Sequence, residues 1–110
     1  MATNSKRIER ILGKALGTVK RKRGFPKIQP NIDHVHVIAE KSFRSDLGIL
    51  YPFTAIVSVL KYPTENQMDW FKKWNSELAD EYNINLNLES VFFDESGDLY
   101  YVFSGINVKK

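Results

Sequence analysis

Residues 85–108 read NLNLESVFFDESGDLYYVFSGINV, and this stretch decides the fold. Two runs rich in aliphatic and aromatic residues, 85–93 and 99–108, flank the short polar segment 94–98. Such runs favour β-strands. Gly97 suits the positive φ that a tight turn requires. The stretch therefore predicts two adjacent antiparallel strands joined by a hairpin loop.

A helix is predicted near the start of the chain, from about residue 5 to about residue 22. Gly13 and Gly17 weaken it by about 1 kcal/mol each relative to Ala, so we expect something to pack on it. Ser5 is the expected N-cap, and Gly24 and Pro26 follow its end. Its apolar residues recur at the spacing of one helical face: Ile8, Ile11, Leu12, Ala15, Leu16 and Val19.

A second helix and two more strands are predicted in the middle of the chain. The helix carries Met68, Phe71, Trp74, Leu78 and Tyr82 and should end near Asn83. Alternation over 34–39 and the apolar run 53–60 predict strands. Residues 40–48 are expected to form a loop, and 24–33 an extended linker, because two prolines exclude a helix.

The order of these elements is α-β-β-α-β-β, which indicates an α+β protein. The simplest packing is a four-stranded, mainly antiparallel sheet with two helices on one face. With 110 residues, 43% hydrophobic and 26% charged, the chain suits one globular domain. It has no cysteine, which excludes disulfides and thiolate sites. We expect an intracellular, cytoplasmic protein, with a virion-associated location left open.

Charge is unevenly distributed along the chain. Residues 1–27 contain nine basic residues and a single acid, Glu9, whereas residues 28–110 contain seven basic and twelve acidic residues. We therefore divide the chain into a basic amphipathic helical arm, 1–27, and a single α+β body, 28–110. The candidate binding residues are the basic residues of the arm: Lys6, Arg7, Arg10, Lys14, Lys20, Arg21, Lys22, Arg23 and Lys27.

These residues predict a non-enzymatic binding or assembly module. Nucleic acid is the first expected partner, because neutralising phosphates releases counterions and gives salt-dependent affinity. An acidic protein surface is an alternative, and an anionic membrane is the least favoured. The protein is alternatively an assembly subunit of a virus particle or ribonucleoprotein, whose arm docks on a neighbouring protein or another copy. Whether the arm instead packs on its own acidic body stays open.

Aromatic residues form the second candidate site. Phe92, Phe93, Tyr100, Tyr101 and Phe103 fall on the two neighbouring strands of the predicted hairpin. Rings on a sheet face can stack unpaired nucleotide bases. Packing of these rings in the core and along the hairpin is the favoured interpretation.

No motif of an enzyme is present. The sequence lacks a phosphate-binding glycine loop, a dinucleotide fingerprint and a Gly-x-Ser-x-Gly elbow. His34 and His36 share a strand face, but no third metal ligand is indicated, so no metal or cofactor is predicted. The enzymatic alternative is a small toxin-like endoribonuclease that uses His36, Lys41, Arg44 and Tyr101 around a phosphate.

Overall fold

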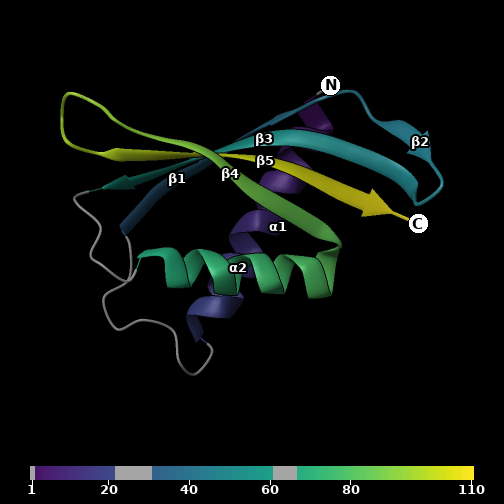
Figure 1. Ribbon diagram of the computed structural model, residues 1–110, viewed down its shortest axis with the longest axis horizontal. Helices are drawn as coiled ribbons and strands as arrows, with labels where there is room; N and C mark the ends of the chain where they lie inside the picture. The colour runs from purple at the N-terminus through teal and green to yellow at the C-terminus, as the bar shows by residue number, and fades with distance from the viewer. Residues whose placement is uncertain (1, 22–30, 61–66) are drawn as a thin grey trace.

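The computed structural model describes residues 2–21, 31–60 and 67–110. The predicted α+β class is confirmed: two helices pack on one antiparallel sheet (Figure 1). The sheet has five strands, one more than predicted. In chain order the elements are α1 (Ala2–Arg21), β1 (Asn31–Ala39), β2 (Phe43–Ser45), β3 (Gly48–Leu60), α2 (Gln67–Tyr82), β4 (Ile84–Phe93) and β5 (Leu99–Lys109).

The strands follow the order β1-β3-β5-β4, and every neighbouring pair is antiparallel. The short β2 pairs with the beginning of β3, on the same side as β1. Figure 1 shows α1 and α2 on one side of the sheet. The opposite side carries no described helix, so the two faces of the sheet differ in what covers them.

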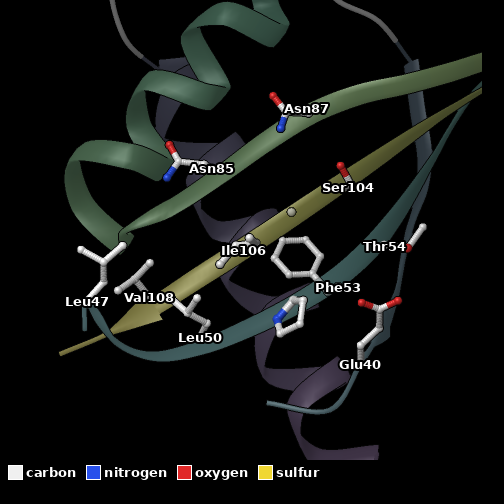
Figure 2. Close-up of a pocket in the computed structure, with 12 residues that line it drawn as sticks. Glu40, Leu47, Leu50, Phe53, Thr54, Asn85, Asn87, Ser104, Ile106 and Val108 are labelled. Carbon is white, nitrogen blue, oxygen red and sulfur yellow. The ribbon is translucent and has the colours of Figure 1, made fainter. Parts of the chain in front are cut away.

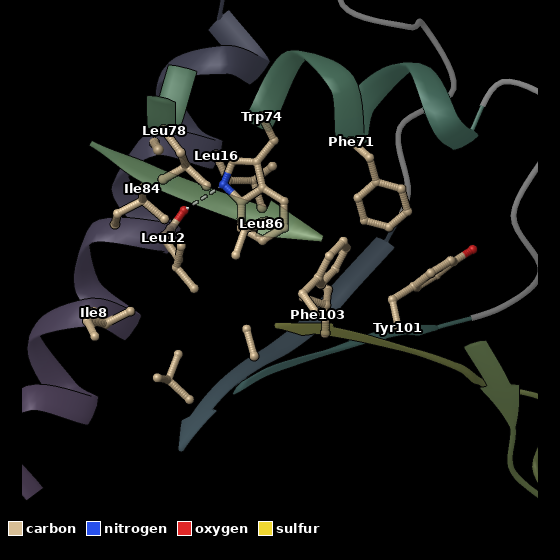
Figure 3. Packing of buried hydrophobic residues seen from close by; sticks show 14 of the residues in the cluster. Ile8, Leu12, Leu16, Phe71, Trp74, Leu78, Ile84, Leu86, Tyr101 and Phe103 are labelled. Atoms are coloured by element: carbon tan, nitrogen blue, oxygen red, sulfur yellow. Dashed lines mark hydrogen bonds between the residues drawn. The ribbon is translucent and has the colours of Figure 1, made fainter. Parts of the chain in front are cut away.

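One hydrophobic core lies between the sheet and both helices (Figure 3). Alternate residues of β3 and β5 point into it, among them Phe53 and Phe103. The ring of Phe71 on α2 meets Phe103 edge-on, with centroids 5.0 Å apart. The apolar stripe of α1 belongs to this core, since Ile8 and Leu12 are fully buried. The sequence predicted that something packs on the first helix, and the structure shows that the sheet and α2 of the same protein do so.

The two helices are also joined by a hydrogen bond inside the core. The indole Nε1 of Trp74 donates to the main-chain carbonyl of Leu12 at 3.1 Å, as Figure 3 shows. Trp74 is fully buried, so water could not replace the Leu12 carbonyl as the acceptor for this N–H. The Cα radius of gyration of 14.1 Å is close to the roughly 13 Å expected for one compact domain of this length.

The structure corrects three local predictions. The first helix begins at Ala2 rather than near residue 5, and Ser5 is therefore not its N-cap. The hydroxyl of Ser5 is engaged elsewhere, because it accepts a hydrogen bond from Ala39 N–H at 3.1 Å. Strand β1 begins at Asn31, so residues 31–33 of the predicted linker are strand. Residues 24–30 lie outside the described residues.

The predicted loop 40–48 is also wrong in part, because it contains β2. A two-residue turn joins Ser45 to Gly48, and the Ser45 hydroxyl accepts a hydrogen bond from Leu47 N–H at 3.1 Å. Gly48 has a φ of 123°, and a Cβ there would lie 2.6 Å from the carbonyl oxygen of Lys109. Only glycine fits this turn without strain, and the turn holds β2 against β3.

The two edges of the sheet differ. β1 is an edge strand, and its outward N–H groups need partners. Side chains of α1 supply two of them: Glu9 Oε1 accepts a hydrogen bond from Val37 N–H at 3.0 Å, and Ser5 Oγ accepts one from Ala39 N–H. At the other edge, β4 pairs with β5 alone among the described strands. The first helix therefore closes one edge of the sheet.

Candidate functional site

Three basic side chains of α1 point away from the sheet. Lys6, Arg10 and Lys14 are exposed and recur every four residues, on the side of the helix opposite its buried stripe. We call these three residues the basic face. The side chain of Lys6 is 73% exposed, and its Nζ lies 3.8 Å from Glu9 Oε2. An ion pair this exposed is weak, so Lys6 stays able to meet another anion.

Gly13 lies on the outward side of the same helix, next to Lys14 in sequence. It is exposed, and a Cβ added there would meet no atom within 4 Å. Packing within the described residues therefore does not require a glycine at this position.

Arg7 does not belong to the basic face. Its guanidinium lies 5.1 Å from the ring centroid of Tyr51, and its Nη1 donates a hydrogen bond to Asn107 Oδ1 at 3.2 Å. The amide of Asn107 in turn donates to the carbonyl of Tyr82, the last residue of α2, at 2.9 Å. Nη2 of Arg7 is enclosed and has no hydrogen-bond partner among the described residues. Arg7 thus links α1 to the ends of β5 and α2, which is a structural role.

The remaining predicted binding residues are not placed relative to this face. Lys20 and Arg21 are described only as helical backbone, and Lys22, Arg23 and Lys27 lie outside the described residues. Of the nine predicted residues, the structure brings three together and separates Arg7 from them.

The second surface is the open face of the sheet, which we define as the face opposite the helices. Cross-strand partners share a face, so the register identifies its members. On the central strands they are uncharged and mostly apolar: Leu50, Pro52, Thr54, Ile56 and Ser58 of β3, and Tyr100, Val102, Ser104, Ile106 and Val108 of β5. In a sheet with one face in contact with water, the residues that point to that face are usually polar or charged. This face therefore differs from an ordinary solvated one.

A hollow of about 410 Å³ lies on the open face (Figure 2). Its apolar lining includes Leu50 and Ile106. Figure 2 shows Asn85 and Asn87 along β4 on one side of Ile106, and Glu40 on the other side. Such a volume is typical of a site for a small ligand or for side chains of a partner.

One carboxylate lines this hollow, and a second lies beside one of its lining residues. Glu40 follows β1 in the chain and lines the hollow directly. Glu89 is on β4, and its Oε1 accepts a hydrogen bond from the hydroxyl of Ser104, another lining residue, at 2.6 Å. Among the described residues that line the hollow there is no lysine or arginine. Sequence reasoning missed this site.

The predicted aromatic site divides between the two faces of the sheet. Tyr101 and Phe103 are buried in the core, at 3% and 1% exposure, and cannot stack on a base. Phe92 and Tyr100 stack on each other on the open face, with ring centroids 5.1 Å apart. The Tyr100 hydroxyl donates to Asp94 Oδ2 at 3.0 Å, so an acidic group lies beside this pair.

Two residues of the endoribonuclease alternative lie on opposite sides of the sheet. The register puts Tyr101 on the helix side of the sheet and His36 on the open face. Nδ1 of His36 lies 3.6 Å from Glu9 Oε1, and its side chain is 55% exposed. The side chain of His34 lies outside the described residues. In the described part of the chain, no three His, Asp or Glu residues are placed to hold a metal ion.

Within the described ranges, neither helix is long and apolar enough to cross a membrane. Comparison of the chain with protein-family models, with curated proteins and with solved structures found no match. Fold and surfaces together define a small, compact α+β domain with a basic helix face and a sheet face that is uncharged along its two central strands.

Proposed function

We propose that this protein is a non-enzymatic binding module that engages an anionic partner, nucleic acid first. The basic face of α1, followed in sequence by Lys20 to Arg23, would supply the contacts. The observation that carries the proposal is the exposure of Lys6, Arg10 and Lys14 on a helix whose other side is fixed in the core. A fixed helix presents its charges in a set geometry, so little ordering cost is added on binding.

The burial of the apolar stripe favours this partner over two others that the sequence left open. Insertion into a membrane surface or docking into a groove of a neighbouring protein would use the apolar side of an amphipathic helix. Ile8, Leu12 and Leu16 are buried in the protein's own core. What α1 offers outward is positive charge, which suits phosphate groups.

The acidic remainder of the chain would orient the complex. Residues 28–110 carry five more acidic than basic residues. A polyanion would therefore be repelled from the body and attracted to the arm. The lack of cysteine is compatible with the reducing interior of a cell, where we place this function.

The test is binding of the protein to single- and double-stranded DNA and RNA across a salt series. The variant replaces Lys6, Arg10 and Lys14 with Gln, and the control replaces Lys41, Lys72 and Lys109 with Gln, an equal charge change outside α1. We expect the first variant to bind more weakly and to lower the log–log salt slope by about 2 to 3. Equal effects of the two variants, or no binding by the native protein at low salt, would reject the proposal.

A further inference from the structure

The open face of the sheet has no cover among the described residues. Along β3 and β5 its ten positions carry no charged side chain, and Ile106 is 39% exposed. On the outer strand β1, the apolar Ile38 is 51% exposed on the same face. Domains of this kind usually bury each apolar sheet face against another layer. An uncovered sheet face on which apolar residues outnumber polar ones marks an interaction surface.

The charges at the rim decide which partner fits. Glu40 lines the hollow on the β1 side, Glu89 lies on the β4 side beside the lining residue Ser104, and no described cation lines the hollow. A nucleic acid would bring its phosphates towards these carboxylates and be repelled. A second copy that packed its own open face here would bring its two glutamates to the same rim. A partner with apolar side chains flanked by lysine or arginine would meet both the floor and the rim favourably.

We infer that the open face docks a basic amphipathic helix of a partner protein. Its aliphatic side chains fill the hollow over Leu50 and Ile106, and its flanking cations pair with Glu40 and Glu89. The helix supplies the missing layer on this side of the sheet, as α1 and α2 do on the other. This inference does not depend on the binding of nucleic acid by the basic face.

The test uses two fluorescently labelled synthetic peptides, a Leu/Lys amphipathic helix and a Leu/Glu helix of the same length and apolar pattern. Binding to the full-length protein is measured by anisotropy, and the contact surface is mapped by ¹H–¹⁵N amide shifts. We expect the Leu/Lys peptide to bind and to shift the amides of Ile56, Val102 and Ile106. The Leu/Glu peptide should bind about tenfold more weakly or not at all.

Variants of the protein localise the effect. Ile106→Lys removes an apolar contact and adds a charge of the same sign as the peptide's lysines. It should weaken binding of the Leu/Lys peptide about tenfold. Ser76→Lys makes the same charge change at an exposed position of α2 and should leave binding unchanged. Glu40→Gln should weaken binding about threefold. Ile106→Thr, which keeps a β-branched side chain, serves if Ile106→Lys fails to fold.

Three outcomes would overturn the inference. The first is equal binding of the two peptides. The second is a set of shifted amides confined to α1. The third is a dimer of the protein in solution that Ile106→Thr dissociates, because the open face would then be an interface between two copies. A nucleic-acid result of either sign leaves these outcomes unchanged, so the two proposals fail separately.

Discussion

The carboxylate of Glu9 accepts a hydrogen bond from the main-chain N–H of Val37 at 3.0 Å. This contact joins a helix to an edge strand 28 residues further along the chain. The Glu9 side chain is 19% exposed, so water substitutes poorly for it. The only acidic residue of the basic arm is therefore used to satisfy β1, which leaves the outward side of α1 basic.

Replacement of Glu9 by Ala is expected to open this edge locally. The N–H of Val37 would lose its acceptor, at a cost of about 1 to 3 kcal/mol. Native-state hydrogen exchange should show faster exchange at Val37 and little change at Ala39. Ser5→Ala should instead speed exchange at Ala39 and leave Val37 little changed, because Ser5 Oγ accepts the hydrogen bond from Ala39 N–H. Unchanged protection of Val37 in Glu9→Ala would contradict the assigned contact.

Two glycine replacements are expected to shift stability in opposite directions. Gly13→Ala should raise the free energy of unfolding by about 0.5 to 1 kcal/mol, because the site is open and Ala favours a helix. Gly105→Ala should lower it by about 1 to 3 kcal/mol. A Cβ at Gly105 would lie 2.6 Å from Cε2 of Phe53 and 2.8 Å from Cδ2 of Leu86. Urea unfolding measures both values.

In the double variant Gly105→Ala, Phe53→Leu, part of this loss should be recovered relative to the sum of the two single variants. The reason is that Phe53 lies directly opposite Gly105 in the register and its ring occupies the space above the glycine. Strict additivity of the two changes would show that the ring and the new methyl group do not collide.

Replacement of Trp74 by Phe is expected to lower stability by about 1 to 2 kcal/mol. The change removes the indole donor to the Leu12 carbonyl and part of a fully buried ring. Thermal unfolding followed by circular dichroism provides the measurement. Tyr82→Phe, on the same helix but only partly buried, is the control and should change stability less. A Trp74→Phe protein as stable as the native one would refute this role.

The hairpin turn is expected to lose stability in acid. The Ser96 hydroxyl donates to the Asp94 carboxylate and lowers its pKa below 3.8, with further donation from Tyr100 and from the N–H groups of Asp98 and Ser96. Because the folded state favours the ionised form, its contribution is present above the unfolded pKa and is lost as pH falls through the lower folded pKa.

Asp94→Asn removes this contribution at neutral pH. The stabilities of the native protein and the variant should therefore converge as pH is lowered from about 5 to about 2. Glu95→Gln removes a charge from the same turn and serves as the control. A pH-independent difference between Asp94→Asn and the native protein would contradict the lowered pKa, which carboxyl chemical shifts measure directly.

Much of the fold follows from local pattern. The hairpin of residues 85–108 was predicted from two apolar runs and Gly97, which has the expected positive φ of 89°. The strand β2 was missed because its three residues, Phe43–Ser45, carry no periodic pattern of their own. The sequence feature that could have indicated β2 is Gly48, which ends the turn between β2 and β3. Ser5 was misassigned because its partner, Ala39, is 34 residues away and no local pattern reveals it.

The candidate surfaces were predictable to different degrees. Helical spacing alone places Lys6, Arg10 and Lys14 together. Charge counting could not separate Arg7, whose position depends on Tyr51 and Asn107. The open face was not foreseen, because β3 is apolar at both odd and even positions. Alternation therefore could not say which side of that strand the helices cover.

The contact between Arg7 and Asn107 spans 100 residues of a 110-residue chain. During synthesis the first helix leaves the ribosome before any strand of the sheet exists. The apolar stripe of α1 cannot be buried until β3 and β5 have been made, and Arg7 cannot bind its partner until Asn107 has been made. Folding that depends on such distant pairs is slow. Until those strands have been made, the nascent chain exposes the apolar side of a basic helix.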